Sequence, residues 1–184
     1  MIAIISLSIA GIIIIYLIAA FNGLVKLKNM TEEGWSGIDV QLKKRYNLIP
    51  NLVSSIKGYA THEKEVFENV AAMRSTGINA KTVVEQAKAE NMITQALGKL
   101  FAVAENYPEL KANENFMDLQ HQLSKIEGDI ELSRRYYNGT VRENNIKVES
   151  FPSNIVANMF SFKKFDFFEI DDVAARDVPK VDFS

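Results

Sequence analysis

Residues 2–21 read IAIISLSIAGIIIIYLIAAF, and no charged side chain occurs before Lys26. Twenty helical residues span about 30 Å, which matches the hydrocarbon thickness of a bilayer. Nine of these twenty residues are isoleucine. β-Branched side chains weaken a helix in water, but in lipid every backbone group must bond within its own helix. The stretch from Ile2 to Phe21 therefore predicts a membrane-spanning helix, and we assign residues 1–25 to the anchor.

A cleaved signal peptide is the main alternative for this segment. Signal peptides place basic residues before an apolar stretch of about 7–15 residues. Here the apolar stretch begins at Ile2 and is longer, and Ile18-Ala19-Ala20 is a poor cleavage site. The chain also has no cysteine for lipid attachment. We therefore expect the anchor to be retained.

Two lysines just beyond the anchor predict its orientation. Lys26 and Lys28 lie within about two helical turns of its apolar end, whereas only the α-amino group lies on the other side. Positively charged flanks favour the cytoplasmic face of a membrane. We therefore expect the N-terminus outside and the C-terminal domain in the cytoplasm.

The rest of the chain holds all 44 charged side chains, 21 basic and 23 acidic. Nucleic-acid binding is disfavoured, because phosphate binding usually shows a basic excess. The lack of cysteine excludes disulfides, thiolate nucleophiles and cysteine-type zinc sites. With only two histidines, a three-histidine metal site within one chain is also excluded.

Apolar residues beyond the anchor recur at helical spacing. A heptad-like seam, typical of a coiled coil, occupies Trp35, Ile38, Leu42, Ile49, Leu52, Ile56 and Tyr59. We expect the membrane helix to run into this seam, with a kink or break at 46–50 caused by Pro50. Nothing at Ala60-Thr61 predicts a stop, so the first clear turn is expected at 74–79.

Further helices are predicted downstream. They cover 81–105, 113–148 with Asn113 as its N-cap, and a short helix at 153–160. The fold class is therefore all-α: a transmembrane helix that continues into an antiparallel up-and-down bundle of about four helices. We assign residues 26–160 to the bundle and 161–184 to a C-terminal tail.

The tail is rich in phenylalanine. Six of the eleven phenylalanines lie from residue 160 onward, and five form a candidate interaction segment: Phe160, Phe162, Phe165, Phe167 and Phe168. Burying such a ring is worth about 1.5–3 kcal/mol, so the tail is expected to be extended but not free in water. It either lies on its own bundle, docks on a neighbouring protomer or another protein, or touches the membrane through residues 162–165.

Two polar residues of the seam region are expected to set helix register, together with Trp35 and Pro50. Arg45 occupies a seam position and Asp39 lies at the seam's edge. Buried ion pairs tend to specify alignment more than they stabilise. Each residue could pair with a charge on the helix at 113–148; the candidates there are Glu127, Glu131, Arg134 and Arg135. A ligand or partner site at these positions is the alternative.

No catalytic constellation is found. His62-Glu63 would need a second histidine at position 66 to match a zinc peptidase motif, and that residue is valine. His62, Glu65 and Glu68 are better explained as a solvated helix face than as a metal site. No glycine-rich phosphate loop or nucleophile elbow occurs. We therefore expect no enzyme activity, no cofactor, no metal and no small-molecule substrate.

Three blocks carry a resemblance: WSGIDVQLKKR at 35–45, LIPNLV at 48–53 and YPELKAN at 107–113. They resemble the LemA family of bacterial membrane proteins, and the resemblance covers nearly the whole chain. It implies one N-terminal helix in the inner membrane, followed by a cytoplasmic antiparallel helical bundle. The family has no established catalytic activity, and one branch is associated with building magnetosome membranes.

Two functions are therefore weighed. The first is a membrane-anchored scaffold that self-associates or organises other membrane proteins. The second is an accessory or regulatory subunit, such as an adaptor for a membrane protease or another membrane complex. An enzyme of unknown type is the third and weakest hypothesis.

Overall fold

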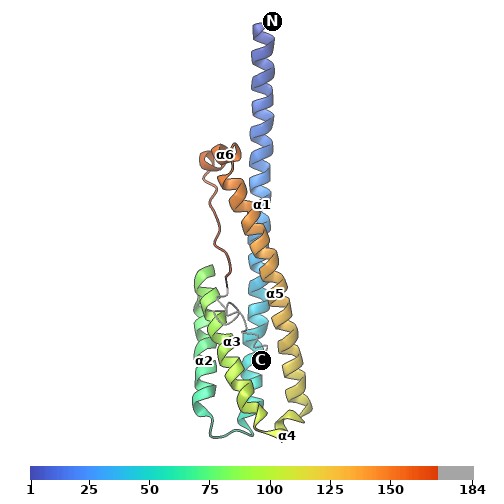
Figure 1. Ribbon diagram of the computed structural model, residues 1–184, viewed down its shortest axis with the longest axis vertical. Coiled ribbons are helices and arrows are strands. Elements are labelled where there is room, and N and C mark those ends of the chain that lie inside the picture. Colours follow the sequence, from blue (N-terminus) through green and yellow to red (C-terminus); the bar gives the residue numbers. More distant parts are fainter. Residues whose placement is uncertain (170–184) are drawn as a thin grey trace, which may run out of the picture. The chain divides into compact units, whose positions relative to one another are not determined.

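The computed structural model describes residues 1–169, and this part of the chain is all-helical, as the sequence predicts (Figure 1). No strand occurs within it. The helices are α1 (Ile2–Lys57), α2 (Lys64–Asn79), α3 (Val83–Glu105), α4 (Pro108–Lys111), α5 (Glu114–Glu149) and α6 (Ser153–Met159). Residues 162–169 have no regular secondary structure, which confirms the extended segment expected after residue 160.

The chain divides into two compact units. Unit 1 contains residues 1–40 and 130–167, and unit 2 contains residues 41–129 together with residues 168 and 169. The boundaries of the anchor at residue 25 and of the tail at residue 161 remain predictions.

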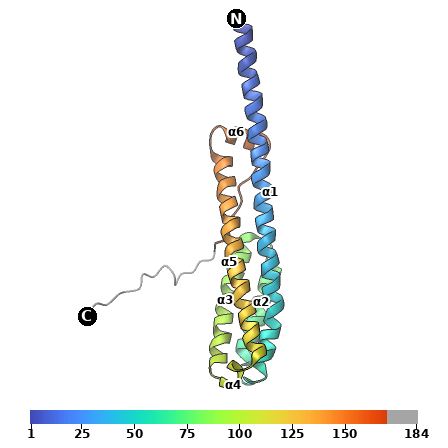
Figure 2. The same cartoon turned by 90° about the vertical axis from the view of Figure 1, so that its right-hand side faces the viewer.

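In unit 1, the N-terminal part of α1 lies antiparallel to the C-terminal part of α5 (Figure 2). Gly34 permits this approach, because a Cβ atom there would lie 3.2 Å from the Cα atom of Tyr137. The rings of Trp35 and Tyr137 pack with their centroids 5.6 Å apart. The short helix α6 crosses α1 near the end of α5, and the first part of α1 extends beyond this crossing without a neighbouring helix (Figures 1 and 2).

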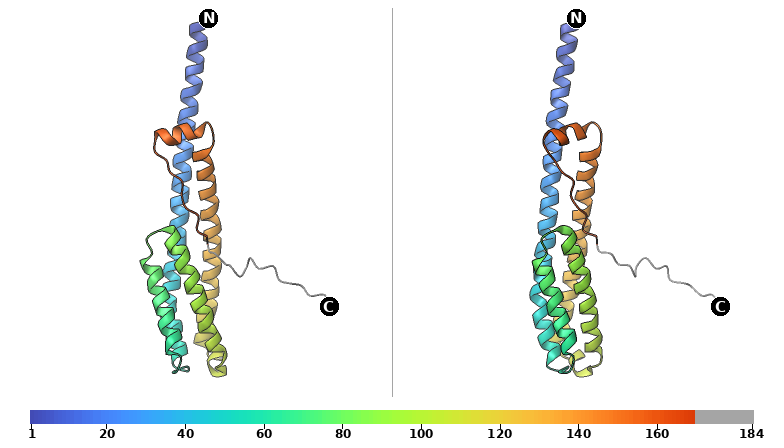
Figure 3. Two further views of the ribbon diagram at one scale, coloured as in Figure 1. Left: turned by 60° about the vertical axis from the view of Figure 1, so that its left-hand side comes forward. Right: turned by 90° about the vertical axis from the view of Figure 1, so that its left-hand side faces the viewer.

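Unit 2 contains four long helical segments: the end of α1, then α2, α3 and the start of α5 (Figure 3). Its core is aliphatic and aromatic, as in other helical bundles. The buried apolar side chains include Leu42, Ile49, Leu52, Ile56, Phe67, Val70, Ile93, Leu97, Leu100 and Leu123. Four of these belong to the seam predicted on α1.

The first turn of the bundle lies earlier than the sequence predicts. Helix α1 ends at Lys57, and residues 58–63 form the connection to α2. Gly58, a weak helix former, follows directly, and the reversal allows Phe67 and Val70 to be buried. Residues 74–79, expected as the turn, instead complete α2.

Of the kink or break predicted near Pro50, the break does not occur, because α1 continues through this residue, whereas the kink stays a prediction. Proline has no backbone N–H, so the carbonyl of Tyr46 loses its usual partner four residues later. In unit 2 the Nε–H of Arg74 donates to that carbonyl at 2.7 Å. A side chain from α2 therefore satisfies the group that the proline would leave unpaired.

Helix starts agree better with the sequence. The side chain of Asn113 accepts a hydrogen bond from the Phe116 N–H at 3.1 Å, which confirms it as the cap of the long helix α5. Thr82 and Glu85 form a reciprocal capping box at the start of α3. Such caps are worth about 1 kcal/mol each, and they set where these helices begin.

Candidate functional site

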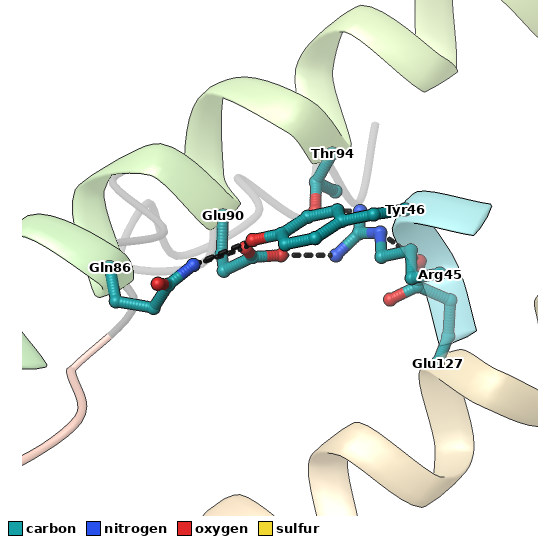
Figure 4. A network of polar contacts seen from close by, with 6 residues as sticks. All are labelled: Arg45, Tyr46, Gln86, Glu90, Thr94 and Glu127. Carbon is teal, nitrogen blue, oxygen red and sulfur yellow. Dashed lines mark hydrogen bonds and ion pairs between the residues drawn. The ribbon is translucent and has the colours of Figure 1, made fainter. Parts of the chain in front are cut away.

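Arg45 is the most conspicuous buried group in unit 2, with a side chain only 2% exposed (Figure 4). Its Nη1 atom donates to Glu90 Oε2 at 2.9 Å, and Nη2 donates to Thr94 Oγ1 at 2.9 Å. Its Nε atom lies 3.0 Å from Glu127 Oε1, within ion-pair range but without hydrogen-bond geometry. One guanidinium thus connects α1 to both α3 and α5.

A second set of bonds surrounds the carboxylate of Glu90. Tyr46 donates its hydroxyl to Glu90 Oε1, and the Gln86 side-chain amide donates to the same oxygen at 2.9 Å. That amide also donates to the Tyr46 hydroxyl oxygen at 2.6 Å. Burial, and then the negative charge of Glu90, raise the pKa of Tyr46 far above its ordinary value. Tyr46 therefore remains a neutral hydrogen-bond donor at any physiological pH.

Glu127 is the solvent-facing member of this network. Its side chain is 39% exposed, whereas those of Arg45 and Glu90 are almost completely buried. Partial burial raises the pKa of Glu127; the positive charge of Arg45 opposes this effect, and the negative charge of Glu90 adds to it. Water can reach Glu127 but not Glu90.

Gly77 on α2 makes room for the Tyr46 ring. A Cβ atom at this position would lie 2.5 Å from the Tyr46 hydroxyl oxygen and 2.9 Å from Ile93 Cδ1. Such distances require a shift of the neighbours, so a larger residue would displace Tyr46 from Glu90. The absence of a side chain at Gly77 is part of the network's geometry.

A hollow of about 370 Å³ lies beside Arg45 in unit 2. Its lining is mostly apolar, with Leu97, Phe101 and Leu123 next to Arg45 and Glu127. The donors on the two Arg45 Nη atoms already bond to Glu90 and Thr94. Within residues 1–169, no three His, Cys, Asp or Glu side chains are placed to hold a metal ion. The arrangement is suited to aligning helices, because its buried polar groups bond to one another across α1, α3 and α5.

The structure places Arg45 against Glu127, one of the four partners named from the sequence. Sequence analysis missed Glu90, because it lies among the apolar residues of α3 and was not singled out. A signal was present: Gln86, Glu90 and Thr94 recur every four residues, so they share one face of α3. Asp39 is half-buried in unit 1 and does not belong to this network, whereas His62 and His121 are exposed.

The anchor stands out in unit 1 because its apolar side chains are uncovered. In residues 1–169, α1 is the one helix long and apolar enough to cross a membrane. Its most apolar 18-residue window has a mean hydropathy of 2.8, with 0% of it buried. Lys26 and Lys28 follow, both exposed. By length and composition, this uncovered stretch could therefore cross a membrane.

A small apolar cluster, here called the junction cluster, joins the end of this stretch to α6. Ala20 and Leu24 of α1 pack on Val156 and Ala157 of α6, and all four are buried. Leu17, Phe21, Val148 and Phe162 surround them. The Phe21 ring packs edge-on against Phe160 at 4.7 Å and against Phe162 at 5.7 Å.

The segment 162–167, here called the strap, is hydrogen-bonded to α5 of the same chain. The Asn145 side chain bonds both the N–H and the carbonyl of Phe165, each at 2.9 Å. Asn144 donates to the Lys163 carbonyl at 3.2 Å, and Tyr137 donates to the Asp166 carbonyl at 2.9 Å. Burial, with the charge of Asp166, raises the pKa of Tyr137 to about 12.

The five predicted tail phenylalanines therefore differ in exposure. Phe162 and Phe165 are half-buried and Phe168 is fully buried, whereas Phe160 and Phe167 remain 53% and 39% exposed. The strap lies on its own chain, one of the alternatives left open. The rest of the predicted tail, residues 170–184, lies outside the described residues.

Comparison with known proteins gives a consistent result. The sequence model of the LemA family matches residues 34–183. Magnetosome protein MamQ 2 of Paramagnetospirillum magneticum is 25% identical over 179 residues, covering 83% of this chain and 66% of that protein. Protein LemA of Metamycoplasma hominis is 26% identical over 175 residues, covering 94% of this chain and 77% of that protein. The chain spans about two thirds of the length of the MamQ relative.

Proposed function

Because the chain belongs to the LemA family, we propose that it is a membrane-anchored helical scaffold that self-associates and organises other membrane proteins. Helix α1 anchors it, with the N-terminus outside and the bundle on the cytoplasmic side of a bacterial inner membrane. The uncovered apolar surface of α1, followed by Lys26 and Lys28, is the observation that carries this proposal. Neither the family description nor the relatives' names suggest a catalytic activity.

The Arg45 network supports a structural role for the bundle. Its groups bond to one another across three helices, so they define alignment rather than present reactive atoms. Trp35, Asp39 and Pro50 are proposed to serve the same alignment. A scaffold needs such a bundle, because partners must meet the same surface on every copy.

Self-association is tested by crosslinking full-length protein in native membranes and measuring its size in mild detergent. A ladder of self-adducts is expected. A variant that ends after Glu169 keeps the junction cluster and the strap, so loss of the ladder there would assign self-association to residues 170–184. A protein that stays monomeric in detergent and yields no adducts contradicts the proposal.

The same experiment separates the second hypothesis from the first. One discrete adduct with a single other protein, in place of a ladder, would favour an adaptor or regulatory subunit. Orientation is tested separately by labelling single cysteines introduced at residues 2 and 29, which leave Lys26 and Lys28 in place, because the natural chain has none. In intact cells an impermeant reagent is expected to label the first position and not the second.

A further inference from the structure

The second apolar face of α6 remains uncovered in unit 1. Val156 and Ala157 are buried against α1, but four large apolar residues on and beside α6 stay exposed. They are Phe151 at 80%, Ile155 at 51%, Met159 at 63% and Phe160 at 53%. Four such residues within ten positions are unfavourable in water, since burying each would be worth about 1.5–3 kcal/mol. This group is here called the α6 face.

The position of α6 along α1 indicates what covers this face. The junction cluster places α6 beside residues 17–24 of α1, and the apolar span ends at Phe21. At 1.5 Å per residue, these eight residues cover about 10 Å along the axis of α1, and the end of the apolar span lies among them. Helix α6 also lies across α1 rather than along it (Figures 1 and 2). A helix across a spanning helix at that level lies roughly in the plane of the membrane surface.

The chemistry around α6 fits a lipid surface. A hollow of about 720 Å³ in unit 1 is lined by Phe21, Phe160 and Phe162, and by Lys28, Lys163 and Lys164. Lys28 pairs at 3.8 Å with Glu32, which also lines the hollow, and Lys164 pairs with Glu149 at 2.7 Å, whereas Lys163 has no ion pair within residues 1–169. Apolar side chains bordered by lysines are typical of helices that lie in the interface of anionic membranes.

We infer that the α6 face inserts into the lipid–water interface of the leaflet in which α1 ends, as a second membrane contact beside the anchor. This inference rests on the anchoring part of the proposed function but not on self-association. The packing of α6 on Ala20 and Leu24 then sets the depth and rotation of the anchor relative to unit 1. Anionic headgroups lie next to Lys28 and Lys163.

The test uses full-length single-cysteine variants with an environment-sensitive fluorophore. Ile155→Cys and Met159→Cys report on the α6 face, and Ile12→Cys reports on the anchor. Leu132→Cys is the matched control, because Leu132 is also an exposed apolar residue of unit 1 but lies on α5, several helical turns before the end that leads to α6. The proteins are reconstituted into phosphatidylcholine–phosphatidylglycerol vesicles that contain lipids with doxyl quenchers at depths from the headgroup region to the centre of the bilayer, so that any lipid-exposed position can be quenched.

Quenching at residues 155 and 159 is expected to approach that at residue 12, with little at residue 132. Quenching at 12 but not at 155 and 159 overturns the inference and leaves the anchor intact. Disulfide-linked dimers of the unlabelled Ile155→Cys variant, together with no lipid quenching of the labelled protein, overturn it in favour of a second copy. An unquenched residue 12 contradicts the anchor itself, and the inference with it. Two labelled positions protect the result against a local effect of either substitution.

Discussion

The two units use different chemistry to hold their helices together. Unit 2 buries an arginine, a glutamate and a tyrosine among apolar side chains. The arginine and the tyrosine both donate hydrogen bonds to the glutamate. In unit 1 the contact between α1 and α6 is made by alanine, leucine and valine, with phenylalanine rings around it. Burial of charge demands an exact partner, whereas apolar packing does not. Helix alignment in unit 2 therefore depends on directional hydrogen bonds and ion pairs, whereas the junction cluster depends on the fit of its apolar side chains.

The largest expected effect comes from breaking the charge network of unit 2. Arg45→Met leaves Glu90 buried without its cation, which should lower the free energy of unfolding by about 3–5 kcal/mol. The double variant Arg45→Met/Glu90→Gln should recover much of this loss, because no buried charge remains. Urea unfolding followed by circular dichroism in detergent measures both. A single substitution that costs under about 1 kcal/mol would show that the network is dispensable.

A second substitution asks whether Arg74 compensates for Pro50. Arg74→Met removes the donor to the Tyr46 carbonyl, at an expected loss of about 1–3 kcal/mol for an unsatisfied buried group. In a Pro50→Ala background, the alanine N–H can restore the helical bond, so Arg74→Met should cost less there. Equal losses in both backgrounds, in the same unfolding measurement, would refute this account.

The strap of unit 1 offers a smaller, local effect. Asn145→Ala removes the side chain that bonds both backbone groups of Phe165. Each lost bond should weaken this segment by about 0.5–1.5 kcal/mol. Hydrogen exchange at residues 162–167 should become faster, while exchange in α3 stays unchanged. Glu149→Gln, which affects only the exposed pair with Lys164, is the control and should change little. Faster exchange throughout the chain would contradict this expectation, because it would mean that the strap also stabilises other parts of the protein.

The smallest expected effect is a pH dependence from Glu127. Its pKa is raised in the folded state, so the native protein binds this proton more tightly than the unfolded chain. The stabilisation is complete below the ordinary value of 4.5 and is lost as pH rises through the folded pKa. Relative to Glu127→Gln, the natural protein should therefore lose stability as pH increases across this window. Glu131→Gln, one turn further along α5, is the control, and an identical difference at all pH values would contradict the expectation.

The sequence predicted those features that depend on local pattern. The apolar run from Ile2, the helical period of the seam and the cap at Asn113 each act within a few neighbouring residues. The exceptions involve partners far along the chain. Pro50 does not end α1 because Arg74, on the following helix, bonds the carbonyl of Tyr46. The four-residue spacing of Gln86, Glu90 and Thr94 marks a polar face of α3, but the pairing of Glu90 with Arg45 is visible only when α1 and α3 are placed side by side.

The end of α1 at Lys57 shows a further limit of what a local sequence pattern can predict. Lys64 and Glu65 continue the helical spacing, and a single glycine at 58 is a weak signal. The helix stops there because reversal buries Phe67 and Val70, which is a property of the folded unit and not of the local sequence.

The junction cluster also constrains the order in which the chain can be completed during synthesis. Leu24 is made early, but its partner Ala157 lies on the last helix of the described chain and is made late. At about 5–20 residues per second, the ribosome needs on the order of ten seconds to supply it. The stretch 41–129 of unit 2 is continuous and can associate within that interval, whereas unit 1 must wait for its last helix. Helix α1 is therefore complete long before the helix that packs on it exists.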